Sequence, residues 1–306
     1  KTAYEIRPRD WSSDVCSSDL IRYGRMLRSP FAFYRGTAGL MAGDLAPLAR
    51  SGLDVQLCGD AHLANFGLYG SPERALVFDL NDFDETLPGP FEWDVKRLAA
   101  SMVVAARDRG FKPKVQRAVA RAAARRYRTA MREFAELPAL DAWYTHLEVD
   151  RALAGVDDAE WRAFAEDAAS RARGKDHLHA AARLTEVVDG ERRIVADPPL
   201  VVPLRDIPAD RLGGEVEHLI GHSFAEYLKT VRDDVGVLLG RFRHVDAALK
   251  VVGVGSVGTR CAILLLQGAD ERDLLFLQIK EARSSVLERH LAPSAYAHPG
   301  HRVVYG

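Results

Sequence analysis

The spacing of apolar positions in the first third of the chain predicts short strands separated by polar loops. The runs Val55–Leu57 and Ala75–Leu80 are apolar and are bounded by turn-forming residues, which is typical of strands. Residues 91–106 then place apolar side chains at helical spacing, and a shorter apolar helix is expected over residues 37–45. The polar side chains of this region therefore lie in loops at strand ends.

The middle of the chain is predicted to be mostly helical. Residues 112–147 and 158–183 are rich in Ala and Arg, with larger apolar residues at helical spacing, and residues 214–240 predict another helix. Two β-prone runs within residues 184–202 flank Asp189-Gly190, a dipeptide that favours a tight hairpin turn. The basic residues lie on polar helix faces, so we expect packing helices and no nucleic-acid surface.

The last third changes to strand-like patterns around a cluster of glycines. Residues 249–254 and 261–266 are apolar and β-prone, and they flank a turn that contains Gly253, Gly255 and Gly258. A third strand is expected over residues 274–280, and it ends at Lys280.

Composition favours a cytoplasmic protein that binds small ligands. The 42 basic residues nearly balance the 43 acidic ones, so no overall field favours nucleic acid or an anionic membrane. No apolar run approaches the roughly 20 residues that span a bilayer. Cys16, Cys58 and Cys261 lack metal-ligand spacing, and their odd number fits a reducing compartment.

Two acidic segments carry the candidate chemistry. Asp60 and Asn65 stand five positions apart, the D-x-x-x-x-N spacing of a kinase catalytic loop. Asp82 and Asp84 follow a predicted strand, with Asp79 as the fallback for Asp82. Carboxylate and amide oxygens suit Mg²⁺, and a further carboxylate can accept the proton of an attacking hydroxyl. Asp60 suits the base, whereas turn formation alone would also explain each of these residues.

The glycine cluster has two nucleotide-binding interpretations. Gly253, Gly255 and Gly258 fit G-x-G-x-x-G, and a dinucleotide fingerprint would require a helix after them. An apolar β-prone run follows instead, which favours a phosphate-covering hairpin loop that includes Ser256. Lys280, one strand later, would then pair with the nucleotide phosphates, although a lysine that protects an edge strand is the alternative.

At these residues the chain resembles a bacterial family called domain of unknown function 2252, from Ile21 to the C-terminus. The resemblance rests on several stretches: Phe33–Gly36, Leu57–Gly67, Phe78–Thr86, Phe91–Ala100, Val251–Cys261 and Gln278–Ala282. The acidic half is also similar to aminoglycoside and choline phosphotransferases, because Gly59–Asn65 matches their G-D-x-H-x-x-N loop and Asp82-Phe83-Asp84 their D-F-D. This second resemblance implies that Asp94, on a helix, braces the loop.

The chain departs from the kinase-like pattern in two places. Cys58 stands where such enzymes usually carry a histidine, and the glycine loop with its lysine follows the acidic motifs instead of preceding them. The resemblance therefore implies an α+β fold with a protein-kinase-like two-lobed core, permuted, and a large helical insertion. Glu288 is a candidate helical partner for Lys280. The resemblance favours an orienting role for His62, although metal ligation in a hydrolase site is the alternative.

Four segments are expected. Residues 1–20 form a foreign or disordered leader, 21–110 hold the catalytic loop and metal ligands, 111–245 are helical with a β-hairpin, and 246–306 form a β-rich lobe truncated at its C-terminus.

The hypothesis is an ATP- and Mg²⁺-dependent phosphotransferase acting on an unknown small-molecule or protein acceptor. Asp60 and His62 would be catalytic, and Asn65, Asp82 and Asp84 would hold metal. Gly253, Gly255, Ser256, Gly258 and Lys280 would bind nucleotide. A non-catalytic nucleotide-binding protein and a metal-dependent phosphohydrolase remain the alternatives.

Overall fold

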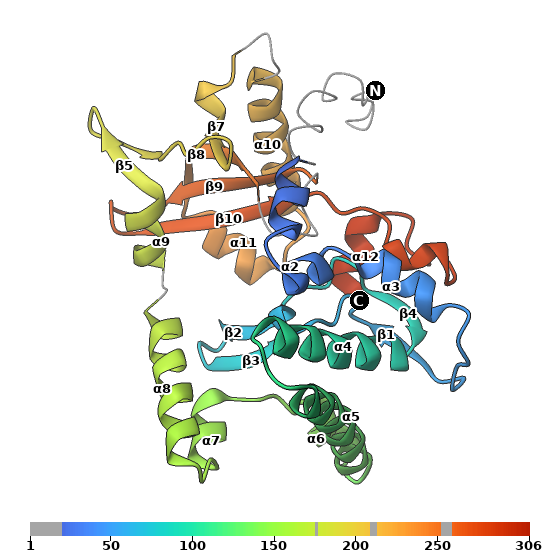
Figure 1. Ribbon diagram of the computed structural model, residues 1–306. Coiled ribbons are helices and arrows are strands. Elements are labelled where there is room, and N and C mark those ends of the chain that lie inside the picture. The colour runs from blue at the N-terminus through green and yellow to red at the C-terminus, as the bar shows by residue number, and fades with distance from the viewer. Residues whose placement is uncertain (1–19, 175–176, 209–212, 252–258) are drawn as a thin grey trace. The chain divides into compact units, whose positions relative to one another are not determined.

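The structure, a computed structural model, describes residues 20–174, 177–208, 213–251 and 259–306 (Figure 1). The chain folds into two compact units. The first unit contains the chain up to residue 172 together with residues 282–306, and the second unit contains residues 173–281. Both combine helices with small antiparallel sheets, so the predicted α+β class is confirmed.

Two small sheets of the first unit bring the acidic segments together. Strand β1 (Asp54–Leu57) pairs antiparallel with β4 (Leu87–Pro90), and the hairpin of β2 (Phe66–Gly70) and β3 (Leu76–Leu80) lies between them in the chain. Because Leu57 is paired with Leu87, the residues that follow β1 lie beside those that precede β4. This pairing places the loop after β1 against the acidic run before β4.

Helices and the C-terminal segment cover these strands. The helices of the first unit include α2 (Pro30–Arg35), α3 (Ala38–Leu45), α4 (Glu92–Asp108), α5 (Pro113–Ala135), α6 (Ala139–Trp143), α7 (Val149–Ala154), α8 (Ala159–Arg173) and α12 (Pro299–Tyr305), with 3-10 turns η1 (Leu63–Asn65) and η4 (Val286–Arg289). Leu57 and Leu87 pack with Trp93 of α4 and with Leu287 of η4 in one buried cluster. Residues 282–306 are therefore part of the core that supports the loop after β1.

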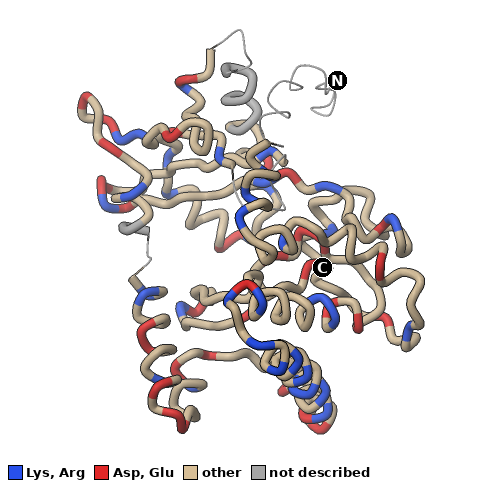
Figure 2. Tube along the Cα trace, in the orientation of Figure 1, with Lys and Arg blue, Asp and Glu red and all other residues tan. Residues whose placement is uncertain are grey.

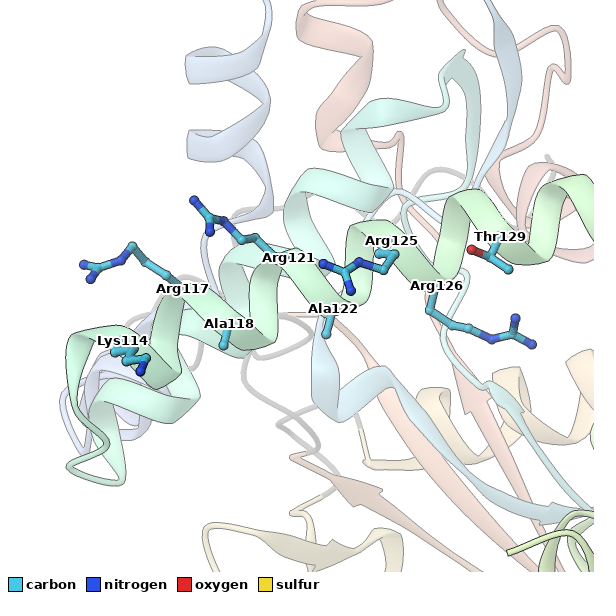
Figure 3. Close-up of a pocket in the computed structure, with 8 residues that line it drawn as sticks. All are labelled: Lys114, Arg117, Ala118, Arg121, Ala122, Arg125, Arg126 and Thr129. Atoms are coloured by element: carbon cyan, nitrogen blue, oxygen red, sulfur yellow. The ribbon is translucent and has the colours of Figure 1, made fainter.

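Helix α5 is a long basic helix with no buried residue. Figure 2 shows Lys and Arg concentrated along it. The helical stretch predicted over residues 112–147 is divided into two helices, because α5 ends at Ala135 and α6 begins after Pro138. A surface hollow runs along α5 and is lined by Lys114, Arg117, Ala118, Arg121, Ala122, Arg125, Arg126 and Thr129 (Figure 3). This hollow has no carboxylate in its lining, so it lacks the ligands for Mg²⁺.

The second unit is built on a four-stranded antiparallel sheet in the order β10-β9-β8-β7. The strands are β7 (Val201–Pro203), β8 (Arg243–Lys250), β9 (Cys261–Gln267) and β10 (Leu274–Lys280). Alternate β9 residues belong to two buried clusters, Ile263 and Leu265 to one, Ala262 and Leu264 to the other. Both faces of the sheet are therefore covered, which explains why β9 is apolar throughout.

Three helices, a 3-10 turn and a hairpin accompany this sheet among the described residues of the second unit. They are the helices α9 (His177–Leu184), α10 (Gly213–Leu228) and α11 (Asp233–Leu239), the 3-10 turn η2 (Leu204–Asp206) and the strands β5 (Thr185–Val188) and β6 (Glu191–Ile194). The predicted hairpin is confirmed, and Asp189 and Gly190 adopt positive φ angles of 53° and 79° at its turn. Among the described residues, every helix is too short or too polar to cross a membrane.

Candidate active site

The loop after β1 is held by the N-terminal turn of α4. Asp94 accepts the backbone N–H of Cys58 through Oδ2 at 2.8 Å and that of Gly59 through Oδ1 at 3.1 Å. The bracing contact that the sequence predicted for Asp94 is therefore present. Gly59 has φ +84°, and a Cβ there would lie 2.1 Å from the Glu85 carbonyl oxygen. Only glycine fits where this loop meets the acidic run.

Asp60 forms an ion pair with a buried arginine that sequence reasoning missed. Arg97 of α4 donates from Nε to Asp60 Oδ1 at 2.5 Å, and its side chain is 3% exposed. The same guanidinium donates to the Tyr34 carbonyl and lies 4.5 Å from the centre of the Tyr34 ring. Burial raises the pKa of Asp60, and the positive charge of Arg97 opposes that shift. The carboxylate is thus oriented through Oδ1, whereas Oδ2 lies 3.8 Å from Nε2 of His62.

A third α4 residue completes the support of this loop. Ser101 is fully buried, and its hydroxyl accepts the Leu63 backbone N–H at 2.9 Å. Asp94, Arg97 and Ser101 follow i, i+3, i+7 spacing, so they share one face of the helix. This helical spacing, next to the apolar face of α4, is the pattern in the sequence from which the contacts of Arg97 and Ser101 with the loop could have been predicted.

Asn65 lies at the end of η1 with its amide group turned back onto the loop. Its Nδ2 donates to the Asp60 backbone carbonyl at 2.9 Å, and the residue is 6% exposed. With the nitrogen used in this way, the amide oxygen is the atom suited to a cation. The structure therefore brings Asn65 and Asp60 together, as their spacing predicted.

Asp82 and Asp84 lie in the turn before β4, near the same loop. The backbone N–H of Asp84 donates to Asp82 Oδ1 at 3.2 Å. The Asp84 charge contributes to the raised pKa of Asp60, and the Asp82 charge acts on His62, so both carboxylates lie within electrostatic reach of the loop. The fallback Asp79 is exposed on β3 and accepts the Leu80 N–H at 2.7 Å.

The C-terminal segment fixes the backbone of this acidic turn. Arg302 of α12 is 2% exposed and donates to the carbonyl oxygens of Asp84, Thr86 and Arg283 at 2.6–2.7 Å. The Glu85 carboxylate accepts the Ser285 hydroxyl at 3.0 Å and the Val286 N–H at 2.7 Å. No local sequence pattern signals these contacts, because they join segments about 200 positions apart.

His62 is buried beside Asp60 as a neutral ring. Its side chain is 3% exposed, and burial, aided by the charges of Arg97 and Arg35, lowers its pKa to about 4. Among the described residues, Nδ1 has no hydrogen-bond partner, and the ring meets Phe31 edge-on at 6.4 Å. No set of three or more His, Cys, Asp or Glu side chains converges on a metal-sized site within the part of the chain that the structure covers.

The predicted nucleotide residues belong to the second unit. Gly253, Gly255, Ser256 and Gly258 lie outside the described residues. The strands β8 and β9 on either side of them pair antiparallel, and exposed Lys280 is paired in register with Cys261, the first residue of β9. Glu288, the candidate partner of Lys280, accepts the Ser285 N–H at 3.2 Å in a capping box.

These features define an α+β protein in which one loop carries Asp60 and Asn65 and is braced by helix α4. A sequence profile of the family described as "Uncharacterized protein conserved in bacteria (DUF2252)" matches residues 18–306, and the chain belongs to this family. No curated protein and no solved structure matches the chain. The family resemblance seen in the sequence is therefore confirmed, whereas the likeness to phosphotransferases stays a prediction.

Proposed function

We propose that this protein is an ATP- and Mg²⁺-dependent phosphotransferase with a kinase-like, permuted fold. The observation that supports it best is the meeting of Asp60, Asn65 and the Asp82–Asp84 turn in one place, held by α4 and by the C-terminal segment. This arrangement places the Asp60 carboxylate, which could accept a proton, beside side-chain oxygens of Asn65, Asp82 and Asp84 that could bind a cation. Mg²⁺ in phosphoryl transfer is commonly held by one or two carboxylates together with substrate phosphates.

The acceptor hydroxyl would lose its proton to Asp60 as its oxygen bonds to the γ-phosphorus, while the bond between that phosphorus and the oxygen of ADP breaks. Oδ2 is the oxygen suited to the proton, because Oδ1 is engaged by Arg97. Burial moves the pKa of Asp60 upward, towards the range in which a base works best near neutral pH. Asn65, Asp82 and Asp84 are assigned to Mg²⁺.

Nucleotide binding is assigned to Lys280 and to the segment that contains Gly253, Gly255, Ser256 and Gly258. Two features of the second unit support this assignment. The strands that flank the glycines are antiparallel neighbours, and Lys280 ends the next strand at the edge of the sheet where β9 begins. This order is the one in which kinases present a glycine-rich loop and its lysine.

The test uses the full chain, Mg²⁺ and γ-phosphate-labelled ATP with a set of alcohol acceptors. Label transferred to an acceptor supports the proposal, and Asp60→Asn should reduce transfer by about 100-fold or more while ATP affinity is kept. Lys280→Ala should weaken ATP binding instead. Asp82→Asn should raise the Mg²⁺ requirement, whereas the matched variant Asp79→Asn should not.

Two outcomes would overturn the phosphotransferase proposal, and a third would overturn the role of Asp60 within it. Label that appears only as free phosphate with every acceptor indicates the metal-dependent phosphohydrolase. Tight ATP binding with no release or transfer of label indicates a non-catalytic nucleotide-binding protein. An unchanged transfer rate in Asp60→Asn would remove Asp60 from the role of base.

A further inference from the structure

Helix α2 presents an arginine to the candidate site. Phe31 and Arg35 are four positions apart on α2, so they lie on the same face, and the Phe31 ring contacts His62 edge-on at 6.4 Å. Next to Arg35, the Tyr34 carbonyl accepts Arg97 Nη2 at 3.1 Å. Phe31 and Tyr34, the neighbours of Arg35 on α2, therefore contact His62 and Arg97, the two residues that lie beside Asp60.

Polar atoms without partners gather at this place. Within the described part of the chain, Nε of Arg22, Nε of Arg35 and Nδ1 of His62 are buried and have no hydrogen-bond partner. Arg22 lies beside Arg35, because its Nη2 donates to the carbonyl of Gly36 at 3.3 Å. A buried polar group without a partner is unfavourable and calls for a specific explanation, such as a water or an ion.

The charges around Asp60 are unevenly arranged. Burial is the main cause of both pKa shifts, and the charges of Arg35 and Arg97 oppose the rise in the pKa of Asp60 and add to the fall in the pKa of His62. The acidic residues that interact with this loop lie on the acidic turn or on α4: Asp82 and Asp84, which the proposed function assigns to Mg²⁺, and Glu85 and Asp94, whose pKa values the Asp60 charge helps to raise. The side of the loop formed by α2 is thus cationic, and arginine forks match the planar or tetrahedral oxygens of carboxylate and phosphate.

We propose that Arg35 and Arg22, with the buried Nδ1 of His62, form a binding site for an oxyanion, a phosphate or a carboxylate, beside Asp60. The anion has two possible sources: the terminal phosphate of the nucleotide, or an anionic group on the acceptor. Both sources rest on the proposed function, and the second implies an acceptor alcohol that carries a negative charge near its hydroxyl group.

Binding of inorganic phosphate to the full-length chain, measured by titration calorimetry, tests the site without any turnover. Wild-type protein should bind phosphate, and Arg35→Gln should weaken that binding by at least tenfold. Arg28→Gln is the matched control, because Arg28 is exposed and belongs to the same stretch of arginines. Equal phosphate affinity in wild type and Arg35→Gln, or no phosphate binding by the wild type, would overturn the proposal.

Folding of Arg35→Gln is checked by its urea midpoint, and Arg35→Lys gives a second reading. Lysine keeps the charge but loses the fork, so Arg35→Lys should bind phosphate with intermediate affinity. If Arg35→Gln does not fold, Arg35→Lys decides: a phosphate affinity equal to that of the wild type would contradict the proposed anion site.

Nucleotides separate the two sources of the anion. A non-hydrolysable ATP analogue with Mg²⁺ should block phosphate binding if the site holds the terminal phosphate, and Mg–ADP should not. If phosphate still binds beside the analogue, the site serves the acceptor, and glycerol 3-phosphate should then accept label better than glycerol or choline. Failure of all transfer would count against the proposed function while the calorimetric result for the anion site stands.

Discussion

The carboxylate of Asp60 and the guanidinium of Arg97 form a 2.5 Å hydrogen bond in which the arginine is almost completely buried. This pair joins the loop after β1 to α4. A buried ion pair adds little net stability, but removal of one member leaves an uncompensated charge. The pair therefore makes the position of Asp60 sensitive to a residue that lies 37 positions away in the chain.

Arg97→Met is expected to lower the free energy of unfolding by about 3 kcal/mol or more, because Asp60 loses its charged partner. Adding Asp60→Asn to the Arg97→Met variant should restore part of the lost free energy of unfolding. Urea unfolding of the wild type, both single variants and the double variant measures the coupling. Strictly additive effects of the two changes would contradict an energetic link between Asp60 and Arg97.

Asp94→Ala is expected to destabilise the protein by about 2–4 kcal/mol, because the N–H groups of Cys58 and Gly59 lose their acceptor. Asp94→Asn keeps one oxygen acceptor and should cost less. Asp108→Asn, on the exposed last turn of the same helix, is the control and should change stability by less than about 0.5 kcal/mol. If Asp94→Ala is no worse than this control, the loop does not depend on the brace.

Arg302→Met should release the acidic turn, since three backbone carbonyl groups lose a charged donor. We expect a loss of about 3 kcal/mol in the free energy of unfolding and faster amide hydrogen exchange in residues 84–86. Arg289→Met, at an exposed position in the same C-terminal segment, should leave both unchanged. Wild-type exchange in Arg302→Met would show that the turn holds its shape without α12.

His62 should make stability depend on pH in the acidic range. Its pKa is about 4 in the folded protein and 6.5 when exposed, so the unfolded chain binds more protons between these values. Stability due to the neutral ring is complete above pH 6.5 and is lost as the pH falls towards 4, by about 3 kcal/mol in total.

The variant His62→Gln isolates this contribution, because the carboxylates that titrate with the opposite sign are present in both proteins. The difference in unfolding free energy between wild type and variant, measured in urea at several pH values, should be level above pH 6.5 and fall below it. A difference that stays constant down to pH 4 would mean that His62 has the same pKa in the folded and unfolded states.

Part of the candidate site was accessible to sequence reasoning because it is local. The spacing of Asp60 and Asn65 brings their groups together within one short loop, and the strand before Asp82 follows from a run of apolar residues. The contact of Asp94 followed from the phosphotransferase resemblance. Arg97 and Ser101 could have been found from their helical spacing with Asp94, but an arginine and a serine on a helix usually face solvent.

The sequence by itself determined which polar side chains are close together along the chain and which short elements carry them. Only the tertiary structure decided how the acidic turn is held and which arginines lie near Asp60. The physical reason is that Arg302, Ser285 and Arg97 act across long separations, through buried donors that meet backbone oxygens or Asp60 only after the core around Leu57 and Leu287 has packed. Local patterns carry no record of such contacts, because any part of the chain could supply the donor.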